Sequence, residues 1–344
     1  MLILVTGATG FVGSHVARLL AERGERVRVL VRATSDMRAL EGVAAEPVRG
    51  DLRDFGSLER AMHGVERVFH VAADYRLWTK HPEEIYESNV EGTRRLLSAA
   101  EKAGVAKFVY TSTVATIAVP RHGALPDETT DASIDEMIGH YKRSKFQAEQ
   151  VALDAARAGA PVVIVNPTAP VGPLDWKPTP TGKIILDFLN GKMPAYVDTG
   201  LNVAPVEDVA LGHLLAADKG RAGERYILGG TNMTLKEILD ALAPIAGRRA
   251  PRVKLPHAVA LAAGYADEFM ARIAGREPKI PVEGVKMSRH RMFVTTGKAE
   301  RELGYVHTSI PAALERAVRW YEANGYVKGF GAAGSKRVAE SAAA

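Results

Sequence analysis

The sequence predicts an α/β protein, in which a doubly wound parallel sheet is followed by a smaller C-terminal domain. Strand-like runs of apolar residues alternate with helix-forming segments through the first half of the chain, which is the pattern of βαβ units. A glycine-rich turn follows the first of these runs directly. Beyond Asn166 prolines become frequent, and this change indicates the loop-rich start of a second domain.

The expected strands are short, and each is followed by a segment of helical composition. The strands cover Leu2–Thr6, Val27–Val31, Val68–Ala72, Lys107–Ser112 and Pro161–Asn166. The crossover helices cover Ser14–Arg23, Ser57–Met62, Pro82–Lys102 and His140–Arg157. Because a helical crossover returns the chain to the same edge of the sheet, consecutive strands are expected to be parallel.

Later segments divide between the two domains. A strand at Glu224–Leu228 is expected to return to the sheet, whereas helices at Thr234–Ile245 and Pro256–Ala274 belong to the second domain. The first domain is then 1–168 plus about 200–230, and the second about 169–199 plus 231–327. We interpret Pro256–Ala274 as a core helix, in preference to a helix that covers an apolar substrate or touches a lipid surface. The Gly/Ala/Ser-rich tail 328–344 is expected to be flexible.

Composition excludes several classes of protein and site. The 344 residues are 47% hydrophobic and 25% charged, as in ordinary globular proteins. Without cysteine the chain has no disulfide, thiolate–metal site or cysteine nucleophile, and a cytoplasmic location is favoured. The ten histidines form no ligand spacing, so no metal site is expected. The net charge of +5 includes no dense basic run, so nucleic acid is not an expected partner.

No membrane-spanning or targeting segment is expected either. The first residues lack a basic region and lead straight into a glycine turn, unlike a signal peptide. The longest uncharged apolar stretch, Leu255–Ala266, is shorter than the roughly 20 residues of a spanning helix.

The glycine-rich turn after the first strand is typical of a Rossmann-type dinucleotide site. Gly7 allows a tight turn, Gly10 lets the backbone approach a pyrophosphate, and Gly13 allows close packing of the following helix on the strand. The helix N-terminus then faces the phosphates. The expected cofactor contacts in this turn are Gly7, Thr9, Gly10, Phe11, Val12 and Gly13.

The end of the second strand indicates which dinucleotide binds. An acidic residue there usually holds the ribose of NAD, but this strand ends in Arg32. A guanidinium suits the 2′-phosphate of NADP, so NADP(H) is favoured, with NAD(H) as the alternative because Asp36 is nearby. Asp51 and Leu52 are expected near the adenine, and Ala72 and Ala73 near the pyrophosphate.

A tyrosine and a lysine four residues apart form the candidate catalytic pair. Tyr141 and Lys145 share one face of a predicted helix. A nearby ammonium favours the phenolate, so Tyr141 gains a role as acid or base, and Lys145 is also expected to hold the nicotinamide ribose. The expected strand Lys107–Ser112 ends in hydroxyl residues, which include Ser112 and Thr113. This end lies at the sheet edge where such folds bind ligands.

Together these motifs resemble an extended short-chain dehydrogenase/reductase, over most of residues 1–327. The features that carry the resemblance are Thr6–Gly13, the strand-end hydroxyls, Tyr141-x-x-x-Lys145 and Val206–Ala210. Asn89–Thr93, Asn166–Thr168 and Val171–Pro173 resemble the dihydroflavonol-reductase-like branch, and Ile138–Phe146 and Asn190–Asn202 resemble the hopanoid-associated sugar epimerase group.

The resemblance implies roles for further residues. It identifies Thr113 as the catalytic hydroxyl, with Ser112 as the fallback, and adds Pro167 and Val171 to the cofactor-binding residues. It also implies a homodimer that pairs through the helices Pro82–Lys102 and His140–Arg157.

Three functions follow from these motifs. Family dehydratases carry a carboxyl pair directly after the strand-end threonine, whereas Val114 and Ala115 stand here. Nucleotide-sugar epimerases of the family usually carry Asn and Arg at the positions of Ala169 and Leu201. We therefore favour an NAD(P)-dependent oxidoreductase acting on a small-molecule carbonyl or secondary alcohol, linked through the resemblance to hopanoid biosynthesis. The alternatives are a sugar or nucleotide-sugar epimerase and a non-catalytic NADP-binding sensor, although a sensor predicts a degraded catalytic triad.

Overall fold

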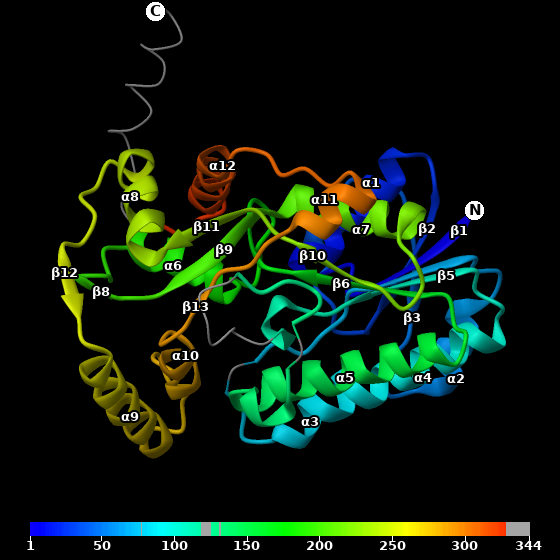
Figure 1. The fold of residues 1–344 in the computed structure, drawn as a ribbon, viewed down its shortest axis with the longest axis horizontal. Helices are drawn as coiled ribbons and strands as arrows, with labels where there is room; N and C mark the ends of the chain where they lie inside the picture. The colour runs from blue at the N-terminus through cyan, green and yellow to red at the C-terminus, as the bar shows by residue number, and fades with distance from the viewer. Residues whose placement is uncertain (77, 118–124, 131, 328–344) are drawn as a thin grey trace, which may run out of the picture.

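A seven-stranded parallel sheet forms the centre of the computed structural model, which describes residues 1–76, 78–117, 125–130 and 132–327 (Figure 1). The strand order is β10-β6-β5-β4-β1-β2-β3, so the direction of winding reverses between β1 and β4. This order confirms the predicted Rossmann-type fold. The strands are β1 (Leu2–Thr6), β2 (Arg26–Val31), β3 (Ala45–Arg49), β4 (Arg67–His70), β5 (Lys107–Thr111), β6 (Val162–Pro167) and β10 (Arg225–Leu228).

Helices cover both faces of the sheet, and the strand sequences show why. Along β1, Leu2 and Leu4 pack into one core cluster while Ile3 and Val5 pack into the other. Strands buried on both faces need apolar residues at every position, and this explains the continuous runs. One face is covered by α1 (Phe11–Glu22) and α7 (Val206–Lys219), and the other by α2 (Phe55–Met62), α4 (Gly92–Lys102) and α5 (Gly139–Arg157).

Three elements of the first domain differ from the sequence prediction. The expected strand ranges omit β3, an edge strand whose Glu46, Pro47 and Arg49 break the apolar pattern. Strand β4 ends at His70 rather than Ala72, because the Ala72 N–H bonds to the Thr6 hydroxyl instead of continuing the ladder. The helix expected at Pro82–Lys102 consists of α3 (Pro82–Tyr86), a π-helical turn (Glu87–Glu91) and α4. Asn89 lies in the π turn and bonds to the backbone of Asp74. The π-helical turn therefore holds the loop after β4 in place through the hydrogen bonds of Asn89.

The later part of the chain forms a smaller layer beside the sheet. Its apolar core is shared by α6 (Pro180–Leu189), α8 (Leu235–Ala246) and α12 (Ile310–Ala323). Its strands are β7 (Ala169–Val171), β8 (Ala195–Val197), β9 (Gly200–Pro205), β11 (Thr231–Thr234), β12 (Val253–Leu255) and β13 (Arg291–Met292). Helix α11 (Gly297–Leu303) packs elsewhere: Ala299 and Leu303 belong to the core between the sheet and α1 and α7, although the sequence assigned them to the second domain.

One helix of this smaller layer contradicts the sequence interpretation. Helix α9 (His257–Ile273) was expected in the core, but only Gly264 and Ala271 of its residues are buried. It lies with α10 (Val282–Met287) at the edge of the molecule (Figure 1). The interpretation was wrong because apolar composition alone does not state whether another element covers a helix. No helix within the described ranges is long and apolar enough to cross a bilayer. The tail 328–344 lies outside the described residues.

Candidate active site

The glycine turn between β1 and α1 has the shape of a phosphate cradle. Gly7 adopts a left-handed conformation, with φ of +70°, and a Cβ there would stand 2.6 Å from the Ala72 backbone nitrogen. A Cβ on Gly13 would overlap the Gly7 carbonyl oxygen. Both positions therefore require glycine, since any side chain would push α1 and the loop after β4 away from the turn.

Helix α1 presents its N-terminus at this turn. Gly10 is the N-cap residue and makes no side-chain cap, and Phe11 begins the helix. The first N–H groups of a helix have no partner within it, so those of Phe11, Val12 and Gly13 are free to meet an anion. A narrow turn of this kind ending at a helix N-terminus fits a dinucleotide pyrophosphate. Thr9, Ala72 and Ala73 border the same turn in sequence or in space.

Charged side chains surround the expected adenine end. Arg32 directly follows β2 and is exposed, and within the described residues its guanidinium has no ion-pair partner. Asp36, the group that would suit NAD, is held by Arg38, with Oδ2 2.5 Å from Nη2. Asp51 is bound by Arg53 at 2.8 Å, and this ion pair holds the pKa of the carboxyl below its usual value. Arg32 is therefore a cation without an ion pair in the described part of this end of the site, although its charge also acts on Asp51.

The candidate catalytic residues come together from β5 and α5. Thr113 lies two residues beyond the end of β5, where its hydroxyl accepts a hydrogen bond from the Ala115 N–H. Tyr141 and Lys145 lie one turn apart on α5. A hydrogen bond joins the side chains of Thr113 and Tyr141. The spacing and the strand-end position seen in the sequence thus bring these side chains into one site.

The Lys145 ammonium is buried against the end of β5. Its Nζ donates to the Tyr110 hydroxyl at 3.0 Å and to the Thr111 carbonyl oxygen at 2.7 Å. Burial lowers the pKa of Lys145 to about 7, while the nearby Glu149 carboxylate acts in the opposite direction. Near neutral pH the charged and neutral forms of Lys145 are therefore both populated.

The pKa of Tyr141 is raised, contrary to the expectation that the Lys145 ammonium lowers it toward the phenolate. Burial raises the pKa of its phenol to about 12, and the hydrogen bond with Thr113 offsets part of that rise. A phenol that keeps its proton at neutral pH, beside the Thr113 hydroxyl, is suited to donate that proton to a substrate oxygen.

The two candidate hydroxyls differ in their surroundings. The Ser112 side chain is buried and its Oγ has no hydrogen-bond partner among the described residues, while its backbone N–H bonds to the Val165 carbonyl. Thr113 is partly exposed and contacts Tyr141. This difference favours Thr113 as the hydroxyl that meets a substrate.

A buried polar network beneath the catalytic residues was missed by the sequence analysis. Glu149 is fully buried and accepts hydrogen bonds from Thr116 at 2.9 Å and from Asn166 at 2.8 Å. Arg225 on β10 pairs with the same carboxylate at 3.2 Å. Asn166 also donates to the Thr113 carbonyl oxygen, so the network fixes the loop that carries Thr113. The available signal was the position of Glu149, one turn beyond Lys145 on the same helix.

A second buried chain of hydrogen bonds links the glycine turn to α4. His70 Nδ1 lies 2.7 Å from the Thr6 hydroxyl, and its Nε2 lies 3.0 Å from the Thr93 hydroxyl. Burial, together with the Lys145 charge, lowers the pKa of His70 to about 3, so the ring is neutral. Because the Thr93 hydroxyl donates to the Asn89 carbonyl oxygen, it accepts from Nε2, and Nδ1 accepts from Thr6.

Apolar residues border the site on the side of β6 and β7. Pro167 ends β6, and Val171, on β7, is buried. Ala169 and Leu201 are partly exposed, on the paired strands β7 and β9. Arg76 is held by Asp74 and Glu84. No group of His, Asp and Glu within the described ranges has the arrangement of a metal site.

Comparison with known proteins establishes the family. The model of the NAD dependent epimerase/dehydratase family matches residues 3–229. The chain belongs to this family. The chain is similar to a putative dihydroflavonol 4-reductase from Synechocystis, 48% identical over 94% of this chain and 95% of that protein. Sterol demethylase protein B from Methylococcus capsulatus is 38% identical over 95% of this chain and all of that protein.

A solved structure agrees with the fold as well as with the sequence. The crystal structure of gox2253 is 48% identical, with a TM-score of 0.85 over 95% of this chain and 99% of that chain. The chain is therefore a nicotinamide-dependent enzyme of this family, as the sequence motifs predicted.

Proposed function

We propose that this enzyme is an NADP(H)-dependent reductase of a carbonyl group, and that it oxidises the corresponding secondary alcohol in the reverse direction. The observation that carries the proposal is the meeting of Thr113, Tyr141 and Lys145 at the carboxyl edge of β5, beside the glycine cradle. This is an acid, a polarising hydroxyl and a cation, which are the groups that carbonyl reduction requires.

Each side chain has a distinct task in this proposal. Thr113 donates a hydrogen bond to the substrate carbonyl oxygen, and Tyr141 transfers its phenolic proton to that oxygen. Lys145 in its cationic form stabilises the phenolate that remains. The bound nicotinamide supplies or accepts the hydride. The glycine turn, Pro167 and Val171 are the proposed contacts that hold the cofactor.

The proposed preference for NADP(H) rests on Arg32. A bidentate guanidinium–phosphate contact is worth about 1.5–3 kcal/mol. Arg32 has no competing ion pair among the described residues, whereas Asp36 and Asp51 are neutralised by Arg38 and Arg53. The ribose end of the site is therefore electropositive and suited to a 2′-phosphate.

The apolar residues on the substrate side favour reduction over the alternatives. Ala169 and Leu201 offer no hydrogen bond to a nucleotide diphosphate, so a nucleotide-sugar substrate has weak support. Val114 and Ala115 supply no carboxyl pair for elimination of water. Relatives are named for a dihydroflavonol and a sterol, and we propose a ring ketone with an apolar body as the substrate class. An epimerase remains the second candidate, because the family model carries that name.

The test is an assay of NADPH consumption by the purified chain with a panel of apolar ring ketones. We expect net oxidation of NADPH, a slower reaction with NADH, and loss of the NADPH advantage in Arg32→Ala. Tyr141→Phe should lower kcat by about 10² or more and leave NADPH binding unchanged.

Turnover of a substrate without net consumption of NADPH would overturn the proposal. An epimerase returns the hydride to its substrate, so tightly bound cofactor and interconversion of nucleotide-sugar epimers without net absorbance change would establish that function instead. Tight NADPH binding with no turnover on either substrate class would establish a sensor.

A further inference from the structure

Helix α9 carries an apolar face that points to solvent. Its exposed large residues are Val259, Tyr265, Phe269, Met270 and Ile273, and their exposed fractions run from 52% to 68%. Alanines fill the remaining exposed positions apart from Arg272. We call Val259, Tyr265, Phe269, Met270 and Ile273 the apolar face of α9.

The acidic residues of α9 turn away from this face. Asp267 accepts hydrogen bonds from the backbone N–H groups of Lys279 and Ile280, and Glu268 accepts one from Val282 at 2.8 Å. These bonds tie α9 to the loop before α10. An ordinary surface helix exposes charged residues and buries apolar ones. On α9 the two acidic residues bond to the following loop, and the large apolar residues face the solvent.

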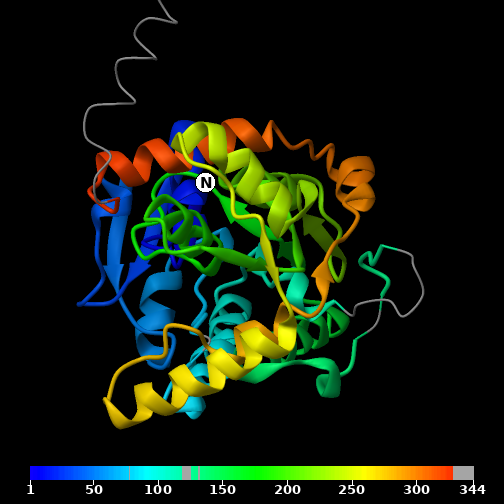
Figure 2. The same ribbon diagram turned by 90° about the vertical axis from the view of Figure 1, so that its left-hand side faces the viewer.

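Lys286 on α10 lies over the Tyr265 ring, with Nζ 5.9 Å from the ring centre, and the large side chains of the apolar face otherwise stay exposed in the part of the chain that the structure describes. Figure 1 shows α9 at the outer edge of the molecule, with α10 between it and α5, and Figure 2 shows α9 running along the surface at one end. A contiguous exposed apolar surface on a folded chain marks an interaction site.

The positive charge of the protein is concentrated around this helix. Residues 247–291 contain ten Lys and Arg but four Asp and Glu, an excess of six positive charges. The whole chain has a net charge of +5, so the remainder is close to neutral. The residues of the apolar face thus lie within the strongly basic segment 247–291.

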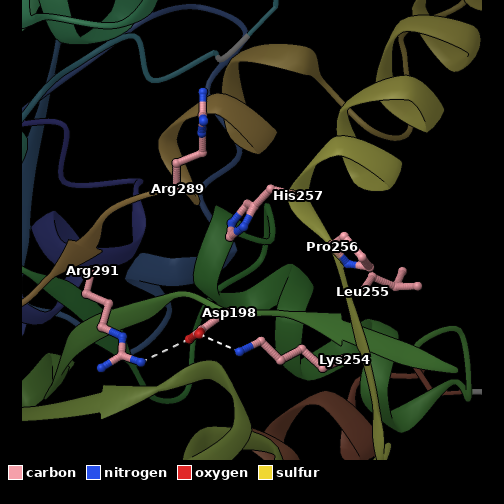
Figure 3. Close-up of a pocket in the computed structure, with 7 residues that line it drawn as sticks. All are labelled: Asp198, Lys254, Leu255, Pro256, His257, Arg289 and Arg291. Atoms are coloured by element: carbon pink, nitrogen blue, oxygen red, sulfur yellow. Dashed lines mark hydrogen bonds and ion pairs between the residues drawn. The ribbon is translucent and has the colours of Figure 1, made fainter.

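A basic cavity of about 520 Å³ opens at the start of α9 (Figure 3). Asp198 pairs there with Lys254 at 2.7 Å and with Arg291 at 3.0 Å. His257 and Arg289 also line the cavity, and Figure 3 shows the Arg289 side chain extending away from the Asp198 ion pairs. The lining thus holds one carboxylate, Asp198, and three cationic side chains, of which Asp198 pairs with two. Its net positive charge is suited to lipid phosphate.

We propose that α9 lies flat on an anionic lipid bilayer, with its apolar face among the acyl chains and the basic segment against the headgroups. An amphipathic helix with exposed aromatic and aliphatic residues beside basic groups is the chemistry of interfacial membrane binding. A second copy of the chain fits less well, because pairing through this face would bring together two segments that each carry an excess of six positive charges.

The docked helix is connected to the proposed catalytic residues. α10, which follows α9, packs at the start of α5: the Glu283 carboxylate accepts a hydrogen bond from the His140 N–H and occupies the space beside Gly139. Tyr141 is the next residue on α5. Docking thus places the bilayer beside α9 and α10, next to the start of α5, and an apolar substrate would be most concentrated there. This last point rests on the proposed function, whereas the docking itself does not.

Vesicle flotation with the full chain tests the proposal. The probes are vesicles of phosphatidylcholine alone and of phosphatidylcholine with phosphatidylglycerol at about 3:1. We expect binding to the anionic vesicles, weaker binding at high salt, and little binding to the neutral ones. Phe269→Ser with Ile273→Ser should weaken the binding by about tenfold or more. The matched control is Val306→Ser, which removes a 74% exposed apolar residue outside this face.

Three results would overturn the proposal: no binding to anionic vesicles, equal binding by the double variant and the control, or equal binding to neutral vesicles. Loss of a dimer in Phe269→Ser with Ile273→Ser, measured by light scattering, would instead identify a second copy as the occupant. Thermal unfolding and NADPH binding of each variant show that it is folded. Failure of carbonyl reduction with vesicle binding intact would overturn the proposed function alone.

Discussion

The charge on a single lysine links the hydrogen-bond geometry of the site to its expected pH dependence. Lys145 is buried between Tyr110 and the Thr111 carbonyl oxygen, and burial lowers its pKa to about 7. Glu149, one turn further along α5, favours the charged form. Burial and the Glu149 carboxylate act on the Lys145 pKa in opposite directions. A modest change in either one therefore changes how much of Lys145 is charged near neutral pH.

Reduction should therefore weaken as the pH rises through about 7. Below that pH Lys145 is cationic and stabilises the Tyr141 phenolate formed by proton transfer; above it the neutral amine does not. Glu149→Gln removes the charge that raises the pKa of Lys145, so the decline should move to lower pH. The measurement is kcat/KM against pH, which reports ionisations of the free enzyme.

Glu22→Gln, which removes a carboxylate from an exposed position on α1, is the matched control. It should leave the decline at the wild-type pH. Identical profiles for Glu149→Gln and the wild type, with unfolding temperatures showing both proteins intact, would mean that Glu149 does not act on Lys145.

At the scale of elements, the contact between the glycine turn and α1 is set by backbone packing. Gly13 lies against the Gly7 carbonyl, and Gly7 lies against the backbone of Ala72. Three segments thus meet without side chains between them, and this close approach leaves the N-terminus of α1 facing the cradle.

Gly13→Ala should therefore destabilise the protein by about 1–3 kcal/mol, the usual cost of overpacking. It should also weaken NADPH binding, because α1 must move away from the turn. Gly284→Ala is the control: Gly284 lies in α10, its added Cβ would meet no atom within 4 Å, and alanine favours a helix by up to about 1 kcal/mol. Denaturant unfolding measures both. Equal stability of the two variants would contradict the packing argument.

At the scale of the whole molecule, we propose a homodimer that pairs through α4 and α5. The outer side of α5 keeps Phe146 and Leu153 partly exposed, and α4 and α5 cover the same face of the sheet. This arrangement leaves the apolar face of α9 outside the dimer contact, so dimerisation and membrane docking are independent.

Light scattering at micromolar concentration should give the mass of a dimer. Phe269→Ser with Ile273→Ser should give the same mass, because α9 takes no part in the pairing. A monomer mass for the wild type would refute the dimer.

The sequence alone determined the sheet apart from β3, the cofactor cradle and the spacing of the candidate catalytic residues. β1 begins at Leu2 and ends at Thr6, as predicted, and Gly7, Gly10 and Gly13 follow it in the expected geometry. These features are local: alternating burial, turn conformation and helix period are each encoded within a few consecutive residues. Tyr141 and Lys145 were found for the same reason.

Only the tertiary structure decided which polar groups are paired and which apolar groups are covered. Glu149 meets Asn166 and Arg225 from distant strands, Arg76 is neutralised by two carboxylates, and few residues of α9 are buried. Pairing and burial depend on what the fold brings opposite a residue, and that partner is remote in sequence. A run of alanines, leucines and aromatics therefore has the same sequence pattern whether it faces a protein core or the solvent. The sequence favoured the core for α9, whereas the structure exposes its large apolar residues.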